Sequence, residues 1–220
     1  MRFKIEITLS LLGINRYSTM LDKAKLFAIN AHGDQLYGDQ PYSVHLERVV
    51  SLLSGHGEIA QIIGYLHDVV EDTEVSITDI KNEFGQYIAD CVSILTDEYG
   101  QNRKERKAKA YAKMSKVSGE LELALVVKAA DRLANLQEGD LGNNTRLIKM
   151  YKKEHEEFKS NVQRDGLAVD IWQQIELLLA DSVVMVKADF NASDSDELIK
   201  ETFEHAPRVT NATQWIKLGR

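Results

Sequence analysis

The sequence predicts an all-helical fold, and three observations support this prediction. The chain has 220 residues, of which 44% are hydrophobic and 28% charged, as is ordinary for one globular domain with a substantial core. It contains only 2 prolines and 13 glycines, so few positions interrupt helices. Apolar residues also recur at helical spacing along much of the chain. We therefore expect long helices rather than many short strands.

The first part of the chain predicts three helices and a loop. Apolar side chains recur at helical spacing over residues 17–32, which indicates an amphipathic helix. Residues 33–42 contain two glycines and a proline, so we expect a loop there. A second helix is expected to begin near Ser43 and to carry His45 in its first turn. The third covers residues 57–70, and its largely apolar surface indicates burial on most sides.

Capping signals and charge define the next elements. Ser76, with Asp79 three residues later, predicts the start of a short helix that Gly85 closes. A further helix is expected to run to about Thr96. Residues 102–114 are rich in lysine and arginine, which predicts an exposed helix with a basic face.

The last three expected helices cover residues 121–136, 145–161 and 167–187. The first of them is largely apolar and carries a few polar groups near its end, which predicts a deeply buried helix. After these helices the composition turns polar. We therefore expect an N-terminal extension over residues 1–16, one domain over 17–188, and a peripheral or partly disordered tail over 189–220.

Charge, cysteine content and hydropathy exclude several classes of protein. Lysine and arginine total 27 against 34 aspartates and glutamates, which gives a net charge of -7, so we expect no nucleic-acid partner. No run approaches the roughly 20 apolar residues that cross a bilayer as a helix, so we expect no membrane association. The single cysteine, Cys91, cannot form an internal disulfide, and a cytoplasmic location is expected. The oligomeric state stays open.

The segment HDVVED gathers four ionisable side chains near the end of the third expected helix: His67, Asp68, Glu71 and Asp72. On a continuous helix residues four apart share a face, which places Glu71 over His67 and Asp72 over Asp68. Burying several carboxylates after the apolar stretch IIGYL is costly unless a cation compensates their charge. Taken alone, the segment is more simply interpreted as a solvated helix end.

A second polar cluster changes that interpretation. Asp131 and Asn135 lie four apart on the expected buried helix, where a carboxylate demands a partner. Two imidazoles and two carboxylates form a mixed nitrogen and oxygen set suited to manganese, iron, cobalt or zinc. The predicted metal ligands are His45, His67, Asp68 and Asp131. Glu71 and Asp72 are expected to be catalytic, because a carboxylate one turn further can orient the attacking water or carry its proton.

Five motifs occur in the order found in alarmone hydrolases: AH..Q, PYSVH, LHDVVEDT, TDEYGQNRKERK and VKAADRLANL. Across about residues 17–160 the sequence resembles the hydrolase domain of RelA/SpoT proteins, and particularly the stand-alone small alarmone hydrolases. This resemblance implies an HD-domain helical bundle. It also implies use of Mn2+ to remove pyrophosphate from the ribose 3′ position of guanosine tetra- or pentaphosphate (ppGpp and pppGpp), the alarmones of the stringent response. Another divalent transition metal would also suit the ligand set.

The resemblance further implies roles for individual residues. Motif matching assigns the metal to His45, His67, Asp68 and Asp131, catalysis to Glu71 and Asp72, and nucleotide binding to Asn135. The basic segment is similar to one that binds phosphates, which implicates Arg103, Arg106 and Lys107, although a basic helix face is usually just solvated. Tyr42 could stack on a base and Tyr151 could line the nucleotide site, although aromatic residues at helical spacing more often belong to a core.

One departure from the family pattern bears on the substrate. The family usually carries an Arg-Lys pair between its glutamine and its PY motif, whereas this chain has Leu36, Tyr37 and Gly38 after Gln35. Two expected cations are therefore missing. The alternative enzyme is an HD-type phosphatase acting on another phosphorylated nucleotide or dinucleotide cofactor. A third class is a non-catalytic nucleotide sensor, against which the retention of every ligand and of both catalytic carboxylates counts.

Overall fold

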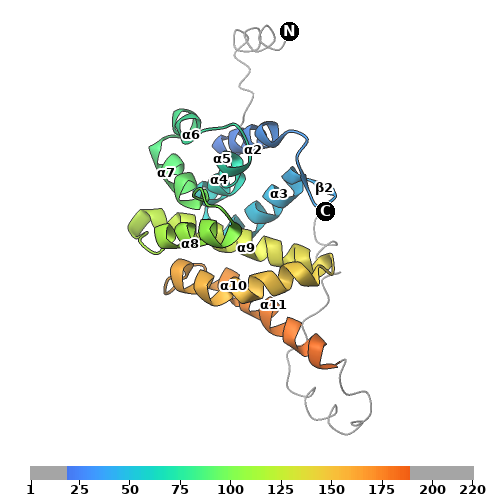
Figure 1. Cartoon of the computed structure of the whole chain (residues 1–220). Coiled ribbons are helices and arrows are strands. Elements are labelled where there is room, and N and C mark those ends of the chain that lie inside the picture. Colours follow the sequence, from blue (N-terminus) through green and yellow to red (C-terminus); the bar gives the residue numbers. More distant parts are fainter. Residues whose placement is uncertain (1–18, 189–220) are drawn as a thin grey trace. The chain divides into compact units, whose positions relative to one another are not determined.

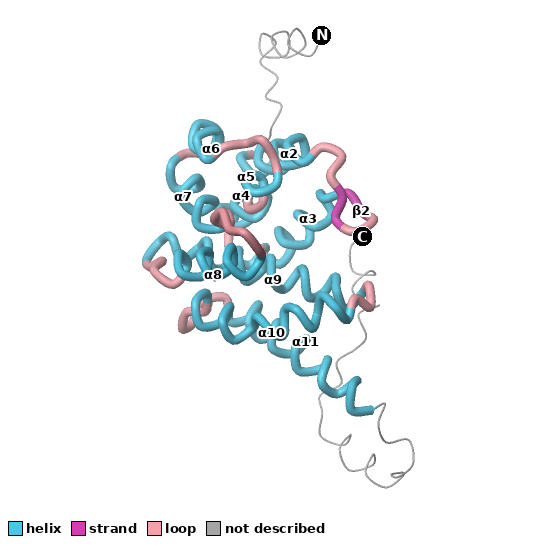
Figure 2. The backbone as a smooth tube through the Cα atoms, viewed as in Figure 1, coloured by secondary structure: helices cyan, strands magenta, loops and turns pink. Residues whose placement is uncertain are grey.

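The all-helical prediction is confirmed by the computed structural model, which describes residues 19–188 (Figure 1). Its α-helices are α2 (Met20–His32), α3 (Tyr42–Leu52), α4 (Glu58–Leu66), α5 (Val69–Asp72), α6 (Ile77–Phe84), α7 (Gln86–Leu95), α8 (Arg103–Met114), α9 (Leu123–Leu141), α10 (Thr145–Val162) and α11 (Val169–Ala188). Two short 3-10 helices, Ser54–His56 and Gly119–Glu122, and a hairpin of strands β1 (Leu36–Tyr37) and β2 (Gln40–Pro41) complete the described part (Figure 2).

The chain divides into two compact units, Met1–Asp181 and Ser182–Arg220. The expected extension over residues 1–16 and the expected tail over 189–220 lie outside the described residues, so the expected domain boundaries stay a prediction. Within residues 19–188, none of the helices combines the length and the apolar character that crossing a membrane requires. The helices α2 to α10 all belong to the first unit.

Local sequence sets the starts of two helices through reciprocal hydrogen bonds. At α2, the Thr19 side chain accepts the backbone N–H of Asp22, and the Asp22 carboxylate accepts that of Thr19. Ser76 and Asp79 form the same capping box at α6, and Gly85 follows the end of that helix with a φ of 93°. The cap that the sequence predicts at Ser76 is therefore confirmed. Each box satisfies N–H groups that have no partner inside the helix.

Helix α9 lies in the core, where it packs against α3, α4, α7 and α10. Its residues are buried without interruption from Ala124 to Leu136, as the sequence predicts. Leu46 of α3, Ile63 of α4 and Leu133 of α9 are fully buried, and burial of one such side chain stabilises the fold by about 1.5–3 kcal/mol. Because neighbours hold α9 on several sides, its few polar side chains are fixed relative to α3 and α4.

Gly64 lets α4 approach α3 closely. A Cβ atom at this position would lie 2.7 Å from Cδ1 of Leu53 and 3.3 Å from Cγ2 of Val50. Any side chain here would therefore force these neighbours to shift. The close approach matters for the site because α3 carries His45 and the end of α4 leads into His67.

The expected continuous helix over residues 57–70 is wrong in one respect. Helix α4 ends at Leu66, a turn contains His67 and Asp68, and the one-turn helix α5 begins at Val69. On a continuous helix successive residues point about 100° apart around the axis, so the two side chains would diverge. In the structure, Nε2 of His67 lies 2.9 Å from Oδ2 of Asp68. Glu71 therefore belongs to α5, a separate helix from the one that precedes His67.

The expected loop over residues 33–42 contains the hairpin of β1 and β2. It pairs Leu36 with Pro41 and Tyr37 with Gln40. Gly38, at a φ of 63°, occupies the turn between the strands, where glycine adopts a positive φ without steric cost. Two-residue strands are too short for an alternating pattern to predict them, so the sequence did not reveal the hairpin.

Candidate metal centre and its pocket

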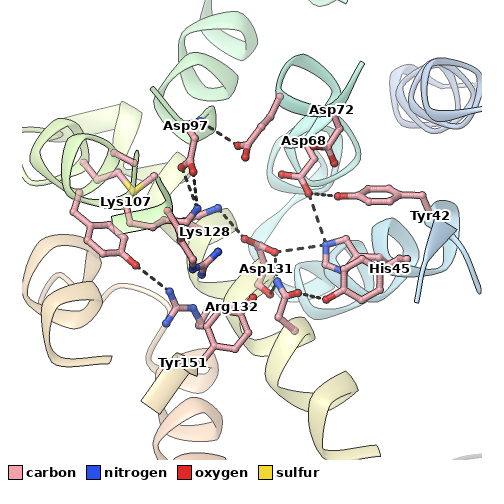
Figure 3. Close-up of a pocket in the computed structure, with 17 residues that line it drawn as sticks. Tyr42, His45, Asp68, Asp72, Asp97, Lys107, Lys128, Asp131, Arg132 and Tyr151 are labelled. Carbon is pink, nitrogen blue, oxygen red and sulfur yellow. Dashed lines mark hydrogen bonds and ion pairs between the residues drawn. The ribbon is translucent and has the colours of Figure 1, made fainter. Parts of the chain in front are cut away.

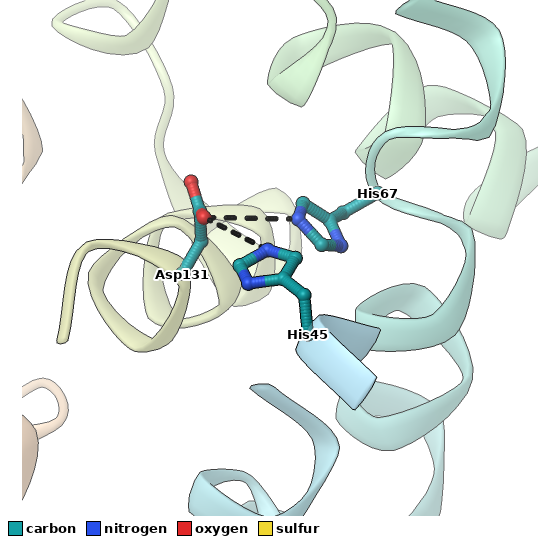
Figure 4. Close-up of side chains that lie close together, drawn as sticks. All are labelled: His45, His67 and Asp131. Carbon is teal, nitrogen blue, oxygen red and sulfur yellow. Dashed lines mark ion pairs between the residues drawn. The ribbon is translucent and has the colours of Figure 1, made fainter. Parts of the chain in front are cut away.

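Three buried side chains from separate elements converge on one point (Figure 4). His45 comes from α3, His67 from the turn after α4, and Asp131 from α9. One ligand atom of each lies within 4.8 Å of the other two. Nε2 of His45 is 3.5 Å, and Nε2 of His67 is 3.8 Å, from Oδ1 of Asp131. This buried His/His/Asp group is consistent with a divalent metal site.

Asp68, the fourth residue that the sequence predicts as a ligand, faces the same point. Its Oδ2 atom is 2.9 Å from Nε2 of His67 and 3.9 Å from Nε2 of His45. The structure thus brings all four predicted ligands together, although they come from positions up to 86 residues apart in the chain, between His45 and Asp131.

Hydrogen bonding leaves His67 ready to act as a ligand. Its Nδ1 atom lies 2.7 Å from the backbone oxygen of Gly64, and because a carbonyl only accepts, Nδ1 carries the proton of the neutral ring. Nε2 then presents its lone pair to the carboxylates, and this buried atom has no hydrogen-bond partner among the described residues. A cation between ring and carboxylates would satisfy both, so the residues present fit a divalent metal ion.

The charges of the cluster favour a cation. Burial opposes ionisation of His67, but the Asp68 and Asp131 carboxylates outweigh burial and raise the pKa of this imidazole to about 10, so a proton would compete with a metal ion for Nε2. Burial also disfavours both carboxylates, yet His67 lowers the pKa of Asp68, and Lys128 lowers that of Asp131, below the usual range. Two carboxylates that stay ionised while buried attract positive charge, which a divalent ion would supply.

A chain of polar contacts supports Asp68. The Tyr42 hydroxyl donates to Oδ2 of Asp68 at 2.5 Å, and the Tyr42 ring stacks on His32 with centroids 4.2 Å apart. Nδ1 of His32 lies 2.8 Å from Oε1 of Gln35, and Nε2 of Gln35 donates to Oδ2 of Asp72 at 3.1 Å. The sequence suggests base stacking for Tyr42, whereas the structure buries it with one ring face on His32. Its position suits it to orient Asp68.

Asn135 and Tyr37 form a second support, next to Asp131. Nδ2 of Asn135 donates to Oδ1 of Asp131 at 2.6 Å and to its backbone oxygen at 2.8 Å, while Oδ1 of Asn135 accepts from the Tyr37 hydroxyl. The Tyr37 ring also stacks on His45, with centroids 4.6 Å apart and 12° between the planes. Asn135 therefore lines the pocket with its amide engaged by Asp131. Sequence reasoning missed Tyr37, whose only signal is an aromatic residue in a polar loop before His45.

Lys128 is another site residue that sequence reasoning missed. It precedes Asp131 by three residues on α9, and its Nζ atom is 2.9 Å from Oδ2 of Asp131. Burial alone would lower the pKa of this ammonium group, but Asp131 and Asp68 outweigh burial and raise it. The spacing was the available signal, because residues three apart meet on the surface of a helix.

The two predicted catalytic carboxylates line the same pocket. Oε2 of Glu71 accepts the backbone N–H of Asp97 at 3.1 Å, and burial together with the charge of Asp97 raises the pKa of Glu71. A raised pKa suits a carboxylate that exchanges protons with water near neutral pH. Asp72 is held by its hydrogen bond from Gln35.

Basic side chains lie across the pocket from His45 and Tyr42 (Figure 3). Nζ of Lys107 is 2.9 Å from Oδ2 of Asp97, and Arg103 makes two parallel hydrogen bonds to Glu154 at 2.9 and 3.0 Å. Arg106, which the sequence groups with them, is not among the lining residues, and its Nε atom is 4.0 Å from Oδ2 of Asp97. The structure therefore separates two neighbours on α8 that sequence reasoning treated alike.

Tyr151, which the sequence suggests as a residue that could line a nucleotide site, lines this pocket. The Arg132 guanidinium lies 4.4 Å from the centre of its ring and 3.9 Å from that of Phe158. Arg132 also donates to the Tyr111 hydroxyl at 3.1 Å. This arginine was not predicted as a site residue, although it follows Asp131 directly in the sequence.

The pocket combines five carboxylates with four basic side chains. The carboxylates are Asp68, Glu71, Asp72, Asp97 and Asp131, and the basic residues are Arg103, Lys107, Lys128 and Arg132. With the histidines neutral, its formal charge is −1. A bound divalent cation would change this to +1, so a loaded pocket would attract an anion such as a phosphate ester.

The fold and the buried His/His/Asp group point to one class of protein. The HD domain family matches residues 24–155, which is more than half of the chain. The chain therefore belongs to the HD domain family.

Two proteins with similar sequences are both named as guanosine-3′,5′-bis(diphosphate) 3′-pyrophosphohydrolases. The chain is 32% identical over 119 residues to guanosine-3′,5′-bis(diphosphate) 3′-pyrophosphohydrolase MESH1 of Danio rerio, covering 51% of this chain and 64% of that protein. It is 34% identical over 124 residues to a probable guanosine-3′,5′-bis(diphosphate) 3′-pyrophosphohydrolase of Synechocystis, covering 54% of this chain and 16% of that protein. In both cases the match spans less than two thirds of the relative's length.

A solved structure agrees with this placement. The structure of a metazoan ortholog of SpoT that hydrolyzes ppGpp matches with a TM-score of 0.65 at 23% identity, covering 76% of this chain and 98% of that one. This likeness shows the fold. The family match and the sequence relatives together show an HD domain protein related to proteins named as guanosine-3′,5′-bis(diphosphate) 3′-pyrophosphohydrolases.

Proposed function

We propose that this protein is a metal-dependent hydrolase that removes the 3′-pyrophosphate from guanosine tetra- or pentaphosphate. The observation that carries the proposal is the buried group of His45, His67 and Asp131, of which His45 and Asp131 line a pocket that four basic side chains also line. Such a pocket offers a place for a hydrolytic metal ion and a place for several phosphates. The similar proteins named as 3′-pyrophosphohydrolases support the choice of substrate. The single cysteine supports a cytoplasmic location.

His45, His67, Asp68 and Asp131 would hold the ion, which we propose to be Mn2+ or another divalent transition metal. When bound, such an ion lowers the pKa of a coordinated water and draws electron density from a phosphoryl oxygen. The imidazole and carboxylate donors are compatible with manganese, iron, cobalt or zinc. The choice of Mn2+ follows the resemblance to alarmone hydrolases.

Glu71 is proposed to take a proton from the attacking water, since its pKa is raised and it lines the pocket. The water oxygen forms a bond to the phosphorus nearest the ribose, and the bond from that phosphorus to the 3′ oxygen breaks. The 3′ oxygen takes a proton and leaves as a hydroxyl group, and pyrophosphate is released. Asp72, held by Gln35, completes the carboxylate pair and is proposed to orient the water.

The remaining polar lining is proposed to bind the nucleotide. Arg103 and Lys107 would contact phosphates, because both line the pocket and both are already oriented by carboxylates. Asn135 and Tyr151 line the same pocket and would contact the ribose or the base.

A second enzyme function is favoured by one specific observation. The hairpin places Leu36 and Tyr37 where the resemblance leads us to expect an Arg-Lys pair, and the Tyr37 ring stacks on His45. A phosphatase acting on another phosphorylated nucleotide or dinucleotide cofactor would not need those two cations. This candidate would share the metal centre and differ in its substrate.

Product analysis tests the proposal. The purified protein, loaded with Mn2+, is incubated with guanosine tetraphosphate, guanosine pentaphosphate and a panel of other phosphorylated nucleotides and dinucleotide cofactors. Release of pyrophosphate together with GDP or GTP is the expected result. Release of orthophosphate from another substrate would support the phosphatase instead. Binding without turnover of any compound would indicate a nucleotide sensor and contradict both enzymes.

A further inference from the structure

Lys128 occupies an unusual place in the pocket, because its charged end contacts a predicted metal ligand (Figure 3). The residue is 8% exposed, yet it lines the pocket. Its Nζ atom lies 2.9 Å from Oδ2 of Asp131. The other oxygen of that carboxylate, Oδ1, faces the imidazoles of His45 and His67 at 3.5 and 3.8 Å. One carboxylate thus lies between the metal centre and an ammonium group.

An ammonium group at this position helps to keep Asp131 ionised, but it also reduces the negative charge that a cation would meet there. Its charge has the same sign as the metal ion that Asp131 would hold, so it opposes metal binding. A lysine is also among the residues least often buried, because removing its charge from water is costly. A metal centre alone would therefore be better served by an uncharged hydrogen-bond donor beside Asp131. An anion that enters the pocket next to the metal explains why a positive charge is present.

The other basic residues of the pocket have partners outside the metal centre. Arg103 is held by Glu154, Lys107 by Asp97, and Arg132 by the Tyr111 hydroxyl and two aromatic rings. Among the four basic lining residues, Lys128 is therefore the one paired with a predicted metal ligand.

We infer that Lys128 is a catalytic residue that binds a non-bridging oxygen of the phosphoryl group under attack. An ammonium group has three N–H donors, so it can keep one hydrogen bond to Asp131 and give another to the substrate. Charge on the phosphoryl oxygens would then be stabilised from one side by the ion and from the other by Lys128. The inference rests on the proposed function only as far as phosphoryl chemistry, and it holds for any nucleoside attached to the phosphate.

The competing explanation is that Lys128 only holds Asp131 in place. The two explanations differ in what is lost when the charge is removed. A residue that merely orients Asp131 would be needed for metal affinity, whereas a residue that binds the phosphoryl group would be needed for anion affinity. Metal binding and anion binding are therefore measured separately.

The experiment compares the wild type with Lys128→Gln and Lys128→Arg. Glutamine can still donate to Asp131 but carries no charge, and arginine keeps the charge. Mn2+ affinity is measured by competition with a chelator, and the affinity of the Mn2+-loaded protein for inorganic pyrophosphate is measured by calorimetry. Lys109→Met serves as the matched control, because Lys109 is a lysine of α8 that does not line the pocket.

We expect Lys128→Gln to bind Mn2+ at least as tightly as the wild type and to bind pyrophosphate about tenfold or more weakly, since a hydrogen bond to a charged group is lost. Lys128→Arg should retain most of the pyrophosphate affinity, and Lys109→Met should behave as the wild type. Weaker Mn2+ binding with unchanged pyrophosphate affinity in Lys128→Gln would overturn the inference. Failure of the loaded wild type to bind pyrophosphate would overturn it as well.

Its failure can be distinguished from failure of the proposed function. Pyrophosphate binding requires no guanosine and no turnover. If the wild type hydrolyses none of the guanosine polyphosphates but Lys128→Gln still loses pyrophosphate affinity, the proposed substrate is wrong and the inference stands. If the guanosine polyphosphates are hydrolysed and Lys128→Gln keeps wild-type turnover and pyrophosphate affinity, the inference is wrong and the proposed function stands.

Discussion

Asp131 connects the two sides of the pocket because its two carboxylate oxygens have different partners. Oδ1 faces both imidazoles and accepts from Asn135, while Oδ2 pairs with Lys128. With both oxygens engaged, the side chain cannot rotate without losing a charged contact. Its orientation toward His45 and His67 is therefore set before an ion arrives, which favours binding by lowering the cost of ordering the ligands.

The ligand assignment makes a direct prediction at this scale. His67→Ala and Asp131→Ala should each lose the single divalent ion, because each removes a donor from a buried group that surrounds one point. Metal content per chain, measured after dialysis against limiting Mn2+, checks this result. His56→Ala is the matched control. Nε2 of His56 lies 3.4 Å from Oδ2 of Asp170, and His56 is not part of the group formed by His45, His67 and Asp131. One ion per chain with unchanged affinity in both ligand variants would show that the assignment is wrong.

Variants of Glu71 and Asp72, the two proposed catalytic carboxylates, should lose turnover without losing the metal ion. Glu71→Gln and Asp72→Asn are expected to keep the ion and to lose turnover by about 10²- to 10⁴-fold, as is typical when general acid or base assistance is removed. The amide replacements keep the shape of each side chain and remove its charge. Single-turnover rates and metal content are measured on the same preparations, with circular dichroism to check the helices. Loss of the ion in either variant would instead make that residue a support of the metal site.

At the scale of elements, helical periodicity was sufficient to place most of the helices but not the interruptions that build the site. The buried helix α9 and the capping box at Ser76 follow from short-range rules, and both are confirmed. The break at His67 and Asp68 does not, because it lies inside a segment whose apolar pattern continues. The sequence nevertheless predicted the four ligands as one group, because buried imidazoles and carboxylates require a shared cation.

The sequence did not predict Tyr37 or Lys128 as site residues, and the reason is the same for both. Tyr37 and Lys128 act through contacts with His45, Asn135 and Asp131 that no local pattern marks. A tyrosine in a polar loop and a lysine in an apolar helix each have a simpler explanation when read alone. Only the packing of the hairpin and α9 around the metal ligands shows what these side chains contact.

Helix α8 provides a prediction with an internal control. Lys107 lines the pocket and Arg106, its neighbour, does not. Lys107→Ala should therefore raise KM more than it lowers kcat, because a phosphate contact made equally in the ground and transition states contributes uniform binding. Arg106→Ala should leave both constants close to those of the wild type. Steady-state kinetics of both variants with the nucleotide that the wild type hydrolyses checks this prediction. An unchanged KM in Lys107→Ala would show that Lys107 does not bind the substrate and that this face of α8 is only solvated.

At the scale of the molecule, the metal ligands join three parts of the described core. His45 lies on α3, His67 and Asp68 between α4 and α5, and Asp131 on α9. Helix α9 packs against both α3 and α4, so the ligands converge only when these helices have assembled. An ion that needs all four ligands binds the folded chain and not the unfolded one. Its binding free energy then adds to the free energy of unfolding.

This coupling predicts a change in thermal stability on metal removal. At a Mn2+ concentration 100 times the dissociation constant, binding to the native state alone adds about 2.7 kcal/mol. For a domain of about 150–250 residues, each kcal/mol shifts the melting temperature by about 2–4 °C. Mn2+ should therefore raise the melting temperature by about 5–11 °C over that of the protein in chelator.

The measurement is a pair of calorimetric or circular dichroism melts, one with excess chelator and one with Mn2+, repeated at several ion concentrations. The shift should grow with the logarithm of the ion concentration, as expected for a ligand that binds only the native state. His67→Ala should melt at nearly the same temperature in both conditions, since it lacks a ligand, whereas Glu71→Gln should keep the full shift because it leaves the ligand set intact. The Glu71→Gln result separates metal binding from catalysis at the level of the whole fold. Equal melting temperatures for the wild type with and without Mn2+ would contradict a metal centre that depends on the folded core.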